Sequence, residues 1–196
     1  MNLNSQNTKY TSLVNAAERL FWKFGIKRIT VDEICHEANI SKMTFYKYFD
    51  NKIELAKHML QIKMKQSMDK YREIMDSDIP FSEKIELSVQ LKMEQTENIS
   101  QEFLTDLYRN PYPELLELFD SLRKELLLEI LKDFSRAQES GELRKDLKPE
   151  FIIYFMNHMF DMAKEKELIS LYPDAQQLIM ELTNFFFYGI MPRTNA

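Results

Sequence analysis

Three helix-start signals close together in the N-terminal third constrain the fold of this chain more than any other feature. Thr30-Val-Asp-Glu33 has the spacing of a capping box, in which the threonine caps a helix and the glutamate bonds back to the cap. Ser41 is a good cap for a second helix, and Asn51-Lys-Ile-Glu54 has the capping-box spacing again. The sequence therefore predicts two short helices followed by a long one at about 51–76.

The joint between the two short helices predicts a helix-turn-helix. Asn39 tolerates the left-handed backbone conformation that such a tight turn requires, and only about three residues separate the two helices. The second helix is expected at about 41–47. A longer helix at 8–24 precedes the pair, because its apolar residues recur at helical spacing and Gly25 follows where a helix commonly ends.

The rest of the chain also reads as helical. The sequence contains only 3 glycines and 6 prolines, too few for the many turns of a sheet protein. Proline-marked joints and apolar spacing predict helices at about 80–98, 113–140, 149–167 and 174–190. We expect an all-α protein of about nine helices, with a three-helix N-terminal unit and a larger helical body.

The helices at 149–167 and 174–190 are apolar on two faces, so each needs two partners. One partner is the core of the chain, and the other is either a second copy of the chain or further packing within the monomer. The residues of these stripes proposed for a dimer interface are Phe151, Met159, Leu178, Leu182, Phe185 and Phe186.

Charge is distributed unevenly along the chain. The formal net charge is −5, yet residues 1–60 hold nine basic and six acidic residues, so the acidic excess lies in the remainder. A basic N-terminal unit on an acidic body is compatible with local binding to nucleic acid. The single Cys35 excludes an internal disulfide, and no apolar run is long enough to span a membrane. With no secretion signal at the N-terminus, we expect a cytoplasmic protein.

Residues 13–60 resemble the DNA-binding domain of the tetracycline-repressor (TetR) family of bacterial transcription regulators. The matching elements run collinearly from Ala16-Ala17 and Phe21 through Phe24-Gly25, Ile29-Thr30-Val31-Asp32-Glu33-Ile34, Ala38-Asn39-Ile40-Ser41, Thr44-Phe45-Tyr46, Tyr48-Phe49, Asn51-Lys52 and Leu55. The chain departs from the family pattern at Asn39, where glycine is usual, at Met43, where many members have glycine, and at Tyr48, often histidine.

The resemblance implies a DNA-binding domain over residues 1–55 and an effector-binding and dimerisation domain over 56–196. Tyr46, Tyr48 and Lys52 match phosphate-contacting positions of the family, and the start of the second short helix meets base edges in such motifs. Phe45 and Phe49 are expected to anchor that helix. The DNA-contacting residues expected are Thr30, Ser41, Lys42, Met43, Thr44, Tyr46, Lys47, Tyr48 and Lys52.

The resemblance further implies a homodimer that represses transcription from a palindromic operator and is released by a small apolar or amphipathic effector. Candidate effector contacts, chosen as adaptable apolar or polar residues of the body, are Met64, Met68, Tyr108, Phe155 and His158. No metal, cofactor or membrane partner is expected. Operator sequence, effector identity and the sign of regulation do not follow from the sequence.

Two other function classes remain open from the residues alone. An all-helical enzyme or small-molecule carrier would need chemistry in the body, which offers no catalytic constellation. A DNA-binding scaffold without an effector would lack a cavity there. Glu33-x-x-His36 has the spacing of a di-iron ligand pair, but a second such motif is missing, and His158 with Asp161 is more simply a structural pair.

Overall fold

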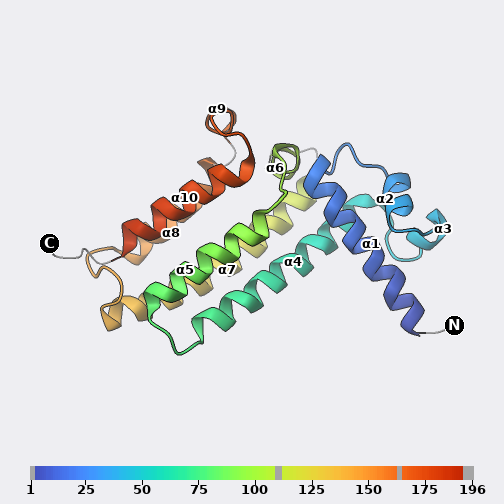
Figure 1. Ribbon diagram of the computed structural model, residues 1–196. Helices are drawn as coiled ribbons and strands as arrows, with labels where there is room; N and C mark the ends of the chain where they lie inside the picture. The colour runs from blue at the N-terminus through green and yellow to red at the C-terminus, as the bar shows by residue number, and fades with distance from the viewer. Residues whose placement is uncertain (1–2, 109–111, 163–164, 192–196) are drawn as a thin grey trace. The chain divides into compact units, whose positions relative to one another are not determined.

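The computed structural model describes residues 3–108, 112–162 and 165–191, and these residues form ten helices and no strand (Figure 1). The all-α prediction is confirmed, with one helix more than the nine or so expected. Contacts divide the chain into two units. We call Met1–Met64 with Asn98–Asp120 the head unit, and Lys65–Glu97 with Ser121–Ala196 the body unit. No helix among the described residues is long and apolar enough to cross a membrane.

The head unit is built around the N-terminal helices. Its helices are α1 (Leu3–Phe24), α2 (Val31–Glu37), α3 (Lys42–Phe45), the first part of α4 (Lys52–Met75), α6 (Gln101–Tyr108) and the start of α7 (Pro113–Ser140). Helix α3 has four residues, shorter than the expected 41–47, and α6 was not predicted. Leu13, Phe21, Ile34, Phe45 and Leu55 are fully buried in this unit.

All three predicted cap residues are found at the starts of their helices, but one of the two predicted capping boxes is incomplete. Thr30 and Glu33 form the complete capping box, with the Thr30 amide donating to Glu33 Oε2 at 2.8 Å. Ser41 Oγ accepts from the Thr44 amide at 3.2 Å. Asn51 Oδ1 accepts from the amides of Ile53 and Glu54, but the Glu54 carboxylate pairs with Lys57 instead of bonding back. The second capping box is therefore only half formed.

The body unit contains the remaining parts of α4 and α7 with α5 (Phe81–Thr96), α8 (Pro149–Met162), α9 (Lys166–Ile169) and α10 (Ala175–Ile190). Its core joins α5, α7, α8 and α10 through Phe81, Phe134, Ile152 and Phe186. The helix expected over 149–167 ends at Met162. Residues 163 and 164 lie outside the described residues, and α9 was not predicted.

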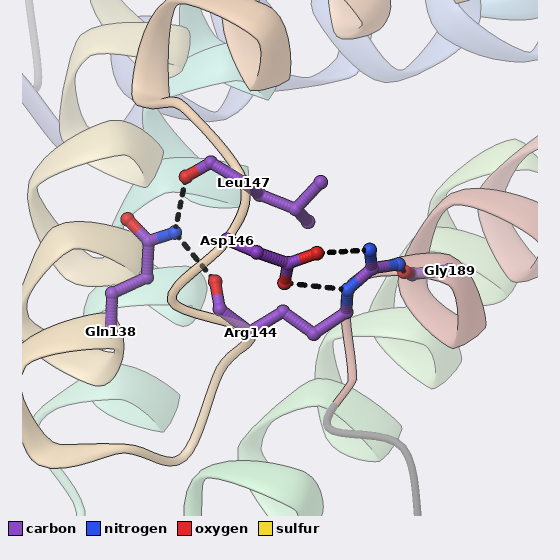
Figure 2. Close-up of polar contacts among 5 residues, drawn as sticks. All are labelled: Gln138, Arg144, Asp146, Leu147 and Gly189. Atoms are coloured by element: carbon purple, nitrogen blue, oxygen red, sulfur yellow. Dashed lines mark hydrogen bonds and ion pairs between the residues drawn. The ribbon is translucent and has the colours of Figure 1, made fainter.

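The loop between α7 and α8 fixes the last turn of α10. The Arg144 guanidinium donates two hydrogen bonds to the Asp146 carboxylate, at 2.7 and 3.1 Å (Figure 2). It also donates to the Gly189 carbonyl at 2.9 Å. The Gln138 side-chain amide holds the loop by donating to the carbonyls of Arg144 and Leu147. These bonds satisfy a carbonyl at a helix C-terminus, which has no partner within its own helix.

Candidate nucleic-acid interface

Helix α3 is a short, exposed helix held by two buried aromatic rings. Phe45 is fully buried and Phe49 is 8% exposed, whereas Met43 and Tyr46 are 71% and 56% exposed. The chain continues as hydrogen-bonded turns after α3, with the Tyr48 and Phe49 amides both donating to the Phe45 carbonyl. The buried rings fix the orientation of α3 and leave its polar and flexible side chains facing outward.

The turn before α3 uses the conformation anticipated for Asn39. Its φ is +53°, in the left-handed region that asparagine enters at low cost, and the Ile40 amide closes the turn onto the Cys35 carbonyl at 2.9 Å. Asn39 therefore substitutes for the glycine usual in the family. The two short helices and this turn form the predicted helix-turn-helix.

Seven of the nine residues expected to contact DNA lie on one continuous segment from Ser41 to Tyr48. Thr30 is the N-cap of α2 and Lys52 is the first residue of α4. Thr30, Ser41, Lys42, Met43, Tyr46 and Lys47 are exposed, and Thr44, Tyr48 and Lys52 are half-buried. No DNA is present to test their contacts, so these assignments stay predictions. The ring of Tyr48 lies edge-on to Tyr10, whose hydroxyl bonds to His58.

Lys42, Ser41 and Thr44 already have protein partners. Lys42 pairs with Asp32 of α2 at 2.7 Å, with both side chains more than half exposed, so the pair is weak and a phosphate or base could replace the carboxylate. The hydroxyls of Ser41 and Thr44 lie 3.0 Å apart and are engaged in capping α3. Both hydroxyls retain oxygen acceptors or donors for a second contact.

Lys52 has a structural role that the sequence did not indicate. Its Nζ donates to three backbone carbonyls, those of Ile26 at 2.8 Å, Lys27 at 2.9 Å and Ile29 at 2.7 Å. Burial lowers the pKa of Lys52, and the carboxylates of Asp106 and Glu33 act in the opposite direction. Since an ammonium group has three donors, a phosphate contact by Lys52 would have to displace one of these carbonyls.

Helix α6 docks on the end of α1 in the head unit. The Asp106 carboxylate accepts from the Lys27 amide at 2.7 Å, and the Ser100 amide donates to the Trp22 carbonyl at 2.8 Å. The Trp22 and Phe103 rings lie 4.6 Å apart. The sequence analysis missed this element, although the apolar spacing of Phe103, Leu104 and Leu107 was an available signal.

Replacing Gly25 with alanine tests this docking. Gly25 has φ of +79°, and an added Cβ would lie 2.6 Å from Asp106 Oδ2. We expect Gly25→Ala to lower the free energy of unfolding by about 1–3 kcal/mol, measured by urea denaturation. Gly141→Ala is the matched control, because Gly141 also has positive φ but its nearest neighbour is 3.7 Å away.

A larger loss for Gly25→Ala than for Gly141→Ala would measure the clash with Asp106, since both substitutions share the backbone cost. Adding Asp106→Ala should recover part of the difference. Equal losses at the two glycines would contradict the close approach of α6.

The expected effector contacts are divided between the two units. Met64 and Tyr108 belong to the head unit, where Tyr108 packs against Phe119. Met68, Phe155 and His158 belong to the body unit; Met68 is buried and Phe155 packs on the core. His158 is exposed, and its ring lies tilted against that of Tyr154 with the ring centroids 4.1 Å apart, so the structure does not place it in the interior.

The expected dimer residues are likewise divided between surface and core. Phe151 and Phe185 are 54% and 72% exposed, and Met159 and Leu182 are half-buried. Leu178 and Phe186 are only 1% and 5% exposed because they pack inside the body unit. For Leu178 and Phe186 the interface assignment is therefore replaced by a role in the core of the chain's own body.

The comparisons with known proteins agree with this geometry. The family model described as bacterial regulatory proteins, tetR family, matches residues 13–59, which hold the whole helix-turn-helix. Residues 13–59 thus match the DNA-binding domain of the TetR family. With this domain, and with a relative named as a transcriptional regulator, the chain is a DNA-binding regulator of transcription and not an enzyme.

Relatives extend the likeness along the chain. The HTH-type transcriptional regulator YhgD of Bacillus subtilis (strain 168), itself uncharacterized, is 25% identical over 150 residues, covering 76% of this chain and 78% of YhgD. Among solved structures, the fatty acid degradation regulator FadR of Bacillus halodurans has a TM-score of 0.72 at 20% identity over 94% of this chain and 97% of FadR. The fold shared with this FadR thus includes residues of both units.

A second solved structure is the transcriptional regulator FadR of Bacillus subtilis in complex with stearoyl-CoA. It has a TM-score of 0.71 at 19% identity, covering 92% of this chain and 99% of that chain. At this identity the similarity shows the shared fold.

Proposed function

We propose that this TetR-family regulator is a homodimeric repressor that binds a palindromic operator and is released by a small apolar or amphipathic effector. The observation that carries the proposal is the exposed segment of α3 and its following turn, which presents Lys42, Met43, Tyr46 and Lys47 above the buried rings of Phe45 and Phe49. Short helices of this kind enter the major groove with their N-terminal residues at the base edges. All residues expected to touch DNA lie within residues 1–55, the proposed DNA-binding domain.

An apolar surface on the body unit supports the homodimer. Phe151 and Tyr154 of α8 and Phe185 and Tyr188 of α10 are each more than half exposed, while α8 and α10 pack together through Phe155 and Phe186. Clustered exposed aromatic side chains are typical of protein interfaces. A two-fold dimer would present two copies of α3 to half-sites about 34–36 Å apart, the repeat of the DNA helix.

A single helix offers a route from effector to operator. Helix α4 is continuous from Lys52 to Met75, and it contributes residues to both the head unit and the body unit. An effector that prefers one of two arrangements of the body would change the position of the two α3 helices through α4 and thereby weaken operator binding. We assign effector binding and dimerisation to residues 56–196, and a cytoplasmic location because the operator is chromosomal.

A gel-shift and footprint on the DNA flanking the protein's own gene, at several salt concentrations, tests operator binding. We expect a protected pseudo-palindrome with a steep salt dependence. Lys47→Ala should make the slope of log K against log salt shallower by about 2, since a dimer loses two phosphate contacts worth about 0.9 each. Lys124→Ala, which removes an exposed lysine of α7 in the body unit, is the matched control and should leave the slope unchanged.

A protected site that Lys47→Ala binds with unchanged slope would contradict the assignment of Lys47 to the DNA surface. If the DNA flanking the gene contains no specific site, the next experiment is a genome-wide binding selection. Failure to recover any specific sequence there would contradict operator binding itself.

A further inference from the structure

Lys92 occupies the centre of the buried face of α5 in the body unit. At 3.6 residues per turn, it points within about 20° of the directions of Phe81 and Ile85. Those two residues, together with Ser88 and Thr96 one turn to either side of Lys92, are each no more than 9% exposed. A charged side chain therefore stands where the helix pattern calls for an apolar one.

Among the residues that the structure describes, no side chain or carbonyl forms an ion pair or a hydrogen bond with the Lys92 ammonium group. Lys84, two turns earlier on the same helix, instead donates to the Met75 carbonyl at 2.7 Å. Burial lowers the pKa of Lys92, and no neighbouring carboxylate acts to raise it. A half-buried ammonium group without a partner lowers the stability of the folded state and leaves its donors available to an anionic ligand.

The surroundings of Lys92 can be deduced from contacts within the body unit. The bond from Lys84 to the Met75 carbonyl sets α4 and α5 antiparallel, which brings Lys92 level with the turn of α4 that carries buried Met68. On the other side, Gln176 donates to the Met93 carbonyl at 2.7 Å, so the start of α10 lies beside Lys92. Lys92 is half-buried, so part of its side chain remains accessible.

We propose that Lys92 binds the anionic head group, a carboxylate or a phosphate, of an amphipathic effector whose apolar chain lies against the body's apolar side chains. The inference rests on the proposed function, because it specifies the effector as an anionic amphiphile. A charge-assisted bond from the ammonium group would compensate the missing partner. Met68, expected from the sequence to contact the effector, would lie beside this head group.

Calorimetric titration of the full-length protein with three probes below their micelle concentrations tests the proposal. The probes are dodecanoate, dodecanoyl-coenzyme A and dodecanol, which share a twelve-carbon chain and differ in head group. We expect wild type to bind at least one anionic probe about tenfold or more tighter than dodecanol, as one charge-assisted bond predicts. The stronger of the two anionic probes identifies a carboxylate or a phosphate as the preferred head group.

Substitutions at Lys92 should remove this preference without removing the apolar site. Lys92→Met is expected to bind all three probes with similar affinity, and Lys92→Arg is expected to retain the anionic preference. Lys124→Met, which replaces an exposed lysine of α7, is the control for nonspecific charge. Wild type that binds no anionic probe, or that binds dodecanol equally well, would overturn the inference, as would a Lys92→Met variant with unchanged preference.

Two separate measurements distinguish failure of this inference from failure of the proposed repressor mechanism. If anionic probes bind through Lys92 but operator affinity is unchanged, the release mechanism fails and the site stands. If dodecanol releases the operator as well as the anionic probes do, the mechanism stands and Lys92 is not a head-group site.

Lys92→Met should also raise the thermal midpoint by about 2–6 °C, since it replaces a half-buried ammonium group that has no partner with an apolar side chain. A fall in the thermal midpoint would contradict the unpaired state.

Discussion

Replacing Lys52 with methionine is expected to lower the free energy of unfolding by about 2–4 kcal/mol. The substitution keeps much of the apolar stem but removes all three donors that the ammonium group provides to the carbonyls of Ile26, Lys27 and Ile29. Hydrogen bonds to charged groups contribute about 1.5–3 kcal/mol each, less where water can replace the donor, as it can at exposed Lys27. The segment between α1 and α2 should therefore loosen.

Urea denaturation of Lys52→Met measures this loss, with Lys57→Met as the control. Lys57 lies on the same helix, and its pair with partly exposed Glu54 at 2.9 Å should contribute less than about 1 kcal/mol. The salt dependence of operator binding separates the two roles considered for Lys52. If Lys52 has a structural role, Lys52→Met lowers the free energy of unfolding and changes the slope of log K against log salt little. If Lys52 contacts a phosphate, the substitution makes that slope shallower and leaves the free energy of unfolding nearly unchanged.

Replacing Phe185 with glutamate is expected to dissociate the homodimer and to weaken operator binding by about 100-fold or more. Phe185 is 72% exposed on α10 beside Tyr188, which is 81% exposed, so the substitution costs the isolated chain little packing. At a two-fold interface it would bury two carboxylates without partners. Loss of the dimer removes the linkage between two half-site contacts, an advantage of about 10²–10⁴ in affinity.

Analytical ultracentrifugation across a concentration series gives the oligomeric state, and a gel shift on the same samples gives operator affinity. Leu87→Glu provides the control, because Leu87 is 38% exposed on α5 and lies outside the α8 and α10 surface. An unchanged dimer in Phe185→Glu would place the interface elsewhere on the molecule. A monomeric wild type would contradict the homodimer altogether.

Local signals carried the sequence prediction of the head unit. The caps at Thr30, Ser41 and Asn51, the left-handed Asn39 and the helix end at Gly25 each depend on neighbours within a few residues, and all five are present in the structure. Such interactions are visible in the sequence because residue type and spacing nearly determine them. The helix-turn-helix and the all-α class followed from these signals.

The features that the sequence did not indicate depend on contacts between distant parts of the chain. Phe185 and Phe186 are adjacent and equally apolar. Phe186 is buried because it packs against Phe134, whereas Phe185 is exposed. Lys52 has the residue type of a phosphate contact, and only the folded segment between α1 and α2 shows that its donors are already used. Periodicity indicates that a residue faces a partner but does not indicate which partner.

The contact between the Trp22 and Phe103 rings has a practical consequence. Trp22 is the single tryptophan of the chain, and it lies where α6 meets the end of α1. Indole emission depends on the polarity around the ring, so the intrinsic fluorescence of the unlabelled protein reports on this one junction. No other tryptophan contributes to the emission. A change at this junction on adding operator or effector can therefore be followed in real time as a change in tryptophan fluorescence.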